Sequence, residues 1–274
     1  MAVDLGDVHP LTVDIKDANG VLANAGTVTL TITLPDLTTV TPAVTNPSTG
    51  RYQVDYPTVQ AGRHQVRWLA TGANASAFVD IFDVRPAFPA YLFSLADAKL
   101  QLNSTSTADD EELRTFIEAT TAVVERIRNQ AIVRRTIVEH RDLGMPPVHG
   151  APGILQHFTL ANYPVLSLTS VVAEDGGLIW NVADMKVTPA GVVEVLQGGI
   201  VWGPVVFTYE AGMTQVPAEC GLGGRVILQH LWETQRGTYG APRAGGLGET
   251  TTVLGYSIPN RAVELLGSAP SGFA

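Results

Sequence analysis

Cysteine is nearly missing from this chain of 274 residues, and Cys220 is the single example. No disulfide can therefore form within one copy, and no cage of thiolates can hold a zinc ion. Hydrophobic residues make up 45% of the chain, which is enough for a sizeable core. We expect packing of apolar side chains, and no covalent or metal cross-link, to stabilise the fold.

Basic residues and long apolar runs are also scarce. The chain has 17 Lys and Arg against 26 Asp and Glu, a formal net charge of −9. Proteins that grip nucleic acid by its phosphates need clustered basic residues, so the charge argues against that class, although DNA could still pass beside such a surface. No apolar run approaches the roughly 18 residues of a membrane span, and the first ten residues carry acids where a secretory signal carries bases. We expect a soluble protein with no membrane partner.

Catalytic motifs are missing as well. The sequence contains no nucleophile elbow, Walker loop, HExxH or paired-cysteine zinc pattern. The six histidines share no metal-ligand spacing, and the glycines at 221–224 and 245–248 lack the lysine and the preceding strand of a phosphate loop. A glycan hydrolase would need two carboxylates facing one cleft, and the scattered candidates are Glu174, Asp175, Asp184, Glu194 and Glu210. We expect no enzyme activity, no metal and no cofactor.

The first 85 residues predict an antiparallel β-sandwich. Short alternating runs are separated by turn signals at 17–20 and 46–50, where Asn and Gly accept the positive φ of tight turns. In the run 27–34, apolar residues alternate with threonines, so one face is core and the other is wet. The expected strands are 11–17, 27–34, 51–57, 62–70 and 77–84. A loose motif resembles the later strands of bacterial immunoglobulin-like domains, and it consists of Gly50, Tyr52, Gly62, His64, Val66 and Trp68.

Residues 108–132 predict a helix of about six to seven turns. Apolar positions spaced by three and four form one stripe, with acids in its first turn and arginines at or beyond its end. A stripe of that length must be buried, and its partners can include other copies of the chain. A second long helix is expected at 217–235. Seven residues are assigned to helix packing or to the core of a ring: Leu113, Phe116, Ile117, Val124, Ile127, Leu231 and Trp232.

The remaining segments are shorter. Ser94 can cap a helix at 95–102, and the runs between 134 and 212 predict one compact antiparallel sheet with a loop at 144–153. Glycines inside the second long helix cost about 1 kcal/mol each relative to alanine. Either that helix starts later, or a neighbouring backbone comes very close to it. Residues 237–249 resemble a flexible tether, and 258–267 form a short amphipathic helix before a loose end.

The order of these segments resembles the head-tail connector (adaptor) proteins of long-tailed bacteriophages. The matching segments are SLADAKLQL, DDEELRTFIEATTAVVE, YPVLSLTSV, FTYEAG, LQHLWETQRG and SIPNRAVELLG, within roughly residues 93–267. The resemblance implies a structural virion protein, assembled in the host cytoplasm, that forms a ring of typically twelve copies at the phage neck. It implies as partners the portal protein, the stopper or tail completion protein, and double-stranded DNA that passes through the channel without sequence-specific binding. It assigns portal docking to Ile258, Pro259, Arg261, Val263, Leu265 and Leu266.

The sequence therefore predicts an α+β multidomain protein. Its expected parts are an immunoglobulin-like sandwich (1–86), a linker (87–94), an adaptor domain with long helices and a small antiparallel sheet (95–236), and a tether with a portal-docking helix (237–274). A neutral to acidic channel wall would repel passing DNA lightly. The alternative is a minor tail or capsid-decoration protein, because immunoglobulin-like modules are common on those proteins too.

Overall fold

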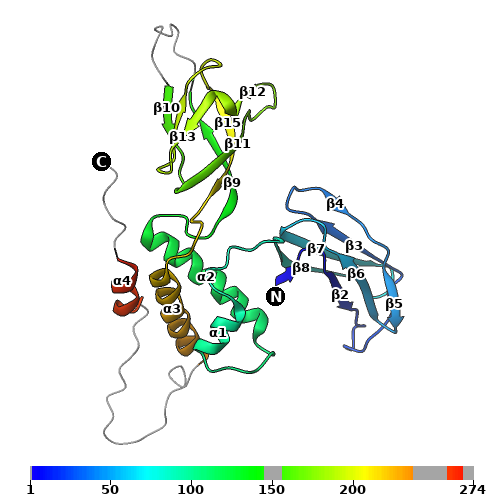
Figure 1. Ribbon diagram of the computed structural model, residues 1–274. Helices are drawn as coiled ribbons and strands as arrows, with labels where there is room; N and C mark the ends of the chain where they lie inside the picture. Colours follow the sequence, from blue (N-terminus) through cyan, green and yellow to red (C-terminus); the bar gives the residue numbers. More distant parts are fainter. Residues whose placement is uncertain (1, 145–155, 237–257, 268–274) are drawn as a thin grey trace, which may run out of the picture. The chain divides into compact units, whose positions relative to one another are not determined.

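A computed structural model of the chain describes residues 2–144, 156–236 and 258–267 (Figure 1). By its contacts the chain divides into two compact units, Met1–Pro89 and Ala90–Ala274. The division falls within the stretch 87–94 that the sequence marks as a linker. The expected tether at 237–249, and all but the first residue of the expected loop at 144–153, lie outside the described residues.

The first unit consists of two β-sheets around one core (Figure 1). The strand orders are β1-β8-β7-β3-β4 and β2-β6-β5. The strands of the larger sheet are β1 (Ala2–Asp4), β8 (Ser76–Arg85), β7 (Gly62–Thr71), β3 (Thr27–Thr33) and β4 (Thr39–Val40). Those of the smaller sheet are β2 (Val8–Asp14), β6 (Arg51–Pro57) and β5 (Thr45–Ser48). All five strands that the sequence predicts in this unit are present.

The alternation of residues along β3 decides which of its faces is buried. Leu30 and Ile32 are fully buried, and Leu30 lies opposite the buried Trp68 of β7. The threonines of β3 lie on the other face. Gly50 occupies a turn with φ +73°, where a Cβ atom would lie 2.7 Å from the carbonyl oxygen of Ile15. These features make a two-sheet sandwich, whereas the immunoglobulin-like assignment stays a prediction.

The second unit combines four described helices with two sheets, so the expectation of one sheet is wrong. Three short strands within 156–195 pair with one another and not with the main sheet, and the separate sheet they form shares a core with it, around Val171, Val193 and Phe207. The main sheet contains β12 (Ile179–Trp180), β11 (Val165–Ala173), β15 (Pro204–Ala211) and β9 (Arg135–Asp142). The second contains β10 (Gln156–Thr159), β14 (Val192–Val195) and β13 (Met185–Val187). The helices are α1 (Leu95–Gln101), α2 (Asp110–Arg128), α3 (Ala218–Arg236) and α4 (Asn260–Leu266).

The long helix α2 is shorter than the expected 108–132. It ends at Arg128 because Asn129 takes the left-handed conformation (φ 50°), in which its backbone cannot continue the helix. The next residues pair with the sheet region instead. The Ala131 backbone N–H donates to the carbonyl oxygen of Tyr163 (2.8 Å), and that of Met213 donates to Ile132 (3.0 Å). The end of α2 is therefore fixed to the sheets.

Candidate assembly interface

The four helices form one layer in which segments far apart in the sequence pack together. α3 contacts α1, α2 and α4, and α4 also contacts α2 (Figure 1). α1 begins at a capping box, in which the Asp97 backbone N–H donates to Ser94 Oγ (3.1 Å) and the Ser94 backbone N–H donates to Asp97 Oδ2 (3.3 Å). The Ser94 hydroxyl also donates to Asp97 Oδ2 (2.7 Å). This bond, followed by the one from the Ser94 backbone N–H, lowers the pKa of Asp97 below its usual value. The predicted cap at Ser94 is confirmed.

The apolar stripe of α2 is largely used within the chain itself. Leu113, Ile117 and Val124 are fully buried, and Ile117 lies in one cluster with Leu228 of α3. The segment before α1 is held against the same helix, because the Leu92 backbone N–H donates to Thr121 Oγ1 (3.0 Å). These three predicted packing residues therefore belong to the core of one copy.

The other predicted packing residues are only partly buried. Phe116 and Trp232 meet edge to face, with ring centroids 5.9 Å apart and an interplanar angle of 88°. Ile127 and Leu231 lie at the rim of the cluster that contains Val124. A contact with a second copy can reach these four side chains, and their place in a ring stays a prediction.

Glycines in α3 make room for its neighbours. A Cβ atom on Gly223 would lie 2.9 Å from Cγ of Leu266, and one on Gly224 would lie 2.6 Å from Cδ2 of Leu92. Gly221 has nothing within 4 Å of the same position. The helix does not start later than expected. A close approach holds at Gly223 and Gly224, where side-chain atoms are nearest, and at Gly223 the backbone oxygen of Ala262 also lies 3.6 Å from the same position.

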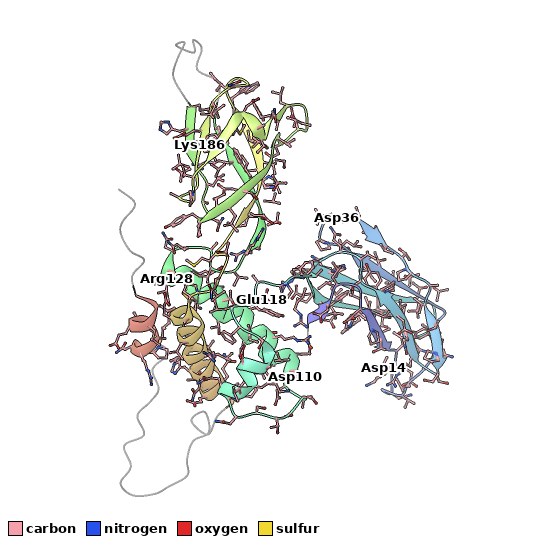
Figure 2. The ribbon with its side chains drawn as sticks, viewed as in Figure 1. Asp14, Asp36, Asp110, Glu118, Arg128 and Lys186 are labelled. Atoms are coloured by element: carbon pink, nitrogen blue, oxygen red, sulfur yellow. The ribbon has the colours of Figure 1, made fainter. Side chains whose placement is uncertain are left out.

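α4 lies in the groove that these glycines leave beside α3. Ala262 and Leu266 are fully buried there and share a cluster with Val124, Cys220 and Ile227, so we call this the α4 groove. Arg128, near the C-terminal end of α2 (Figure 2), donates from Nη1 to the Leu266 carbonyl oxygen. Burial raises the pKa of the Cys220 thiol, which is fully covered. The groove fixes both the face and the end of the short helix.

The six portal-docking residues divide between two sides of this arrangement. Leu266 is inside the groove and Ile258 packs at its rim. Arg261 is exposed, and Val263 has 45% of its surface exposed. Pro259 and Leu265 are half-buried. Among the described residues, the outward part of α4 exposes Asn260 and Glu264 at its centre with Arg261 and Val263 at its two borders, and this part is open to a partner.

The corner between α2 and β9 is held by one carboxylate. Glu125 Oε1 accepts from the backbone N–H groups of Ile132 (2.9 Å) and Val133 (3.1 Å), and Arg135 donates to both of its oxygens at 2.7 and 2.8 Å. A hollow of about 220 Å³ beside it is also lined by Asn129 and Tyr163, which bond to each other (3.1 Å). Because these polar groups already bind one another, the corner is a structural joint.

Three of the five scattered carboxylates lie in ion pairs on the sheets. Glu174 pairs with His140 (3.1 Å), Glu210 with Arg134 (2.6 Å) and Glu194 with Lys186 (3.9 Å), at three different places on the sheets. Within 2–144, 156–236 and 258–267, no group of three or more His, Cys, Asp or Glu side chains could hold a metal ion. In the same stretches no helix is long and apolar enough to cross a membrane.

Sequence reasoning missed Glu125, Arg128 and Ala262 as parts of this layer. In the sequence Glu125 looks like one more surface acid of an amphipathic helix. Only the structure shows that it lies next to Arg135 and fixes the corner between α2 and β9. The signal for the α4 groove was present, since Gly223 and Gly224 are costly in a helix unless something packs against them.

No protein-family model and no curated protein matches the chain. Among similar solved structures are a chain from the neck of an empty GTA particle (15% identity, TM-score 0.44) and one from the virion of a native gene transfer agent (GTA) particle (16%, 0.43). Each match covers 67% of this chain and 93% of the other. The Lin-41 filamin domain matches 31% of this chain and 82% of its own length, at 23% identity and a TM-score of 0.28. At these scores the likeness says nothing of what this chain does.

Proposed function

We propose that the chain is a structural virion protein without enzyme activity, an adaptor of the phage neck. In this role twelve copies form a ring between the portal protein and the stopper or tail completion protein, and the ring extends the channel through which double-stranded DNA passes. Assembly takes place in the host cytoplasm. The first unit, as an immunoglobulin-like module, lies on the outside of the ring.

The observation that carries this proposal is the spatial meeting of the adaptor-like segments. All of them lie in the second unit, and four of the six pack together as α1, α2, α3 and α4. Each of these motifs is short, and only their order along the chain is specific. In the fold, four of them together build a helical layer with α4 on its surface. The two GTA structures come from particles of a related kind, but the proposal does not rest on them.

The side of α4 that faces away from the groove supplies the portal contact. Arg261 and Glu264 provide charges and Val263 an apolar side chain, a combination that suits the rim and the centre of a protein interface. Leu266 contributes indirectly, because it fixes the rotation of α4 that turns these residues outward.

The proposal is tested with purified chain and the portal ring of the same particle. Electron microscopy of the mixture is expected to show a second ring beneath the portal, and Val263→Asp combined with Arg261→Glu is expected to abolish it. The matched control combines Leu37→Asp with Arg67→Glu, which makes the same change in net charge at two exposed positions of the first unit. Normal portal binding by the α4 variant would place the docking surface elsewhere, and binding to major capsid or tail-tube protein alone would favour the decoration role.

A further inference from the structure

The sandwich of the first unit has four edges, and three of them carry features that block pairing with another strand. Such protection is usual, because an open edge offers unpaired backbone groups to any extended chain. β4 has only two residues, and beyond its pairing with Ile32 and Thr33 the outer face of β3 carries Thr27, Thr29 and Thr31, so no apolar row is offered there. β5 contains Pro47 and an irregular register, and β2 contains Pro10, whose nitrogen has no hydrogen to donate.

The fourth edge, along β8, lacks this protection over most of its length. β1 runs beside β8 but pairs only with Asp83, Val84 and Arg85. Among the described residues no strand pairs with 76–81 on that side. This stretch, Ser-Ala-Phe-Val-Asp-Ile, contains no proline and one charge, Asp80. We call residues 76–81 the open edge.

The open edge exposes apolar side chains on both faces of the sheet. Phe78 lies opposite the buried Trp68 of β7, on the face that carries the core, and is 47% exposed. Val79 and Ile81 lie on the outer face and are 64% and 51% exposed. A strand that pairs with this edge would therefore cover apolar surface on both sides at once, which a contact with one face alone would not achieve.

We propose that the open edge pairs antiparallel with the open edge of a second copy of the chain, centred on Val79. In this register Ala77 lies opposite Ile81 of the second copy and Val79 opposite Val79, so the outer face gains one continuous row of small and branched apolar residues. On the inner face Phe78 lies opposite Asp80. The segment is thus complementary to itself when its direction is reversed.

Charge selects this direction. An in-register parallel pairing would place Asp80 directly opposite Asp80 of the second copy, and like charges in that position destabilise a sheet. The antiparallel pairing places each carboxylate beside an aromatic ring at the water-accessible rim. Pairing also joins the five-stranded sheets of the two copies into one sheet, in which the two β8 strands are neighbours at the centre. The β4 strand of each copy then lies at an outer edge of this sheet.

Engineered disulfides test the register. In a Cys220→Ala background of the full chain, Val79→Cys is expected to give disulfide-linked dimers, because residues directly opposite have Cβ atoms about 4.5–5.5 Å apart. Ala77→Cys alone is the matched control. Its two copies would lie about 13 Å apart, four residues along the strand, which is too far for a disulfide. A mixture of Ala77→Cys with Ile81→Cys is expected to form heterodimers.

Two results would overturn the inference. One is the absence of a Val79→Cys dimer under mild oxidation, and the other is equal cross-linking of Ala77→Cys alone, which would indicate random collision. Sedimentation of cysteine-free chains gives a second measurement, in which Ile81→Lys should abolish pairing and Thr29→Lys, on the outer face of β3, should not. The inference stands apart from the proposed function, since portal binding through α4 should be unchanged by Ile81→Lys or Thr29→Lys in chains that keep Cys220.

Discussion

At the scale of single residues, the glycines of α3 show how closely the helical layer is packed. Three glycines fall within four positions of one helix, yet their surroundings differ. Gly221 faces open space, Gly223 faces Leu266 of α4, and Gly224 faces Leu92 and Phe93. The helix loses propensity at all three positions and gains a close contact at two of them.

Alanine substitutions at these glycines should therefore act in opposite directions. Gly224→Ala would bring a methyl group to 2.6 Å from a Leu92 side chain that is itself buried, so we expect a loss of about 1–3 kcal/mol in the free energy of unfolding. Gly221→Ala meets nothing and should raise it by about 0.5–1 kcal/mol. Urea denaturation of both variants measures the difference. Equal effects would mean that the close approach at Gly224 is not a constraint.

At the scale of elements, the turn from α2 into β9 depends on Glu125. Glu125→Ala would leave the backbone N–H groups of Ile132 and Val133 without this acceptor, and Ile132 is fully buried. It would also break the ion pair with Arg135. We expect it to lower the free energy of unfolding by about 2–3 kcal/mol. Glu118→Ala, at an exposed position of the same helix (Figure 2), should stay within about 0.5 kcal/mol. A loss of similar size in both variants would show that helix charge, and not the joint, is responsible.

The capping box of α1 gives a pH-dependent contribution. Because the bonds from Ser94 lower the folded-state pKa of Asp97 below 3.8, the carboxylate stabilises the fold above that pH, and the stabilisation is lost as the pH falls through the folded-state pKa. Asp97→Ala should cost about 0.5–1 kcal/mol at pH 7, a modest value because solvent screens the partly exposed group. The difference from the natural chain should shrink in acid. Ser94→Ala combined with Asp97→Ala should cost less than the sum of the two, and strict additivity would contradict a shared box.

Elements were predictable from sequence where periodicity and end signals agree. The alternation of β3 and β7, the cap at Ser94 and the length of α3 follow from local patterns alone. β1, β4 and β5 were missed because strands of two to four residues are too short to show a period, and β1 is defined only by its parallel partner β8. The end of α2 was missed although Asn129 is a known helix-ending residue type, since the apolar spacing continues through Ala131.

At the scale of the whole molecule, sequence patterns could locate the helical layer but not assign its faces. The apolar positions of α2 were visible, yet whether Leu113 and Phe116 meet the same chain or another copy depends on where α1 and α3 lie. The C-terminal helix shows the same limit. Its six predicted docking residues form one short segment of the sequence, and the fold divides them, with Leu266 buried and Val263 exposed. A linear motif does not show which helix packs against it, and that neighbouring helix decides which of its residues are buried.

This division leads to a prediction about portal binding, for which Cys220 is a built-in reporter. The thiol is fully buried in the cluster that includes Ala262 and Leu266, so a chain that lacks residues 258–274 should react much faster with a maleimide than the full chain. If the portal binds Arg261 and Val263 while α4 stays in its groove, adding portal should leave the reaction slow or slow it further. Leaving the groove would expose Leu266, at a cost of about 1.5–3 kcal/mol for that side chain alone. We therefore expect α4 to remain docked. Faster labelling on addition of portal, with Cys220→Ala chain as the control for thiols of the portal itself, would mean that α4 leaves the groove and that Ile258, Leu265 and Leu266 make the contact instead.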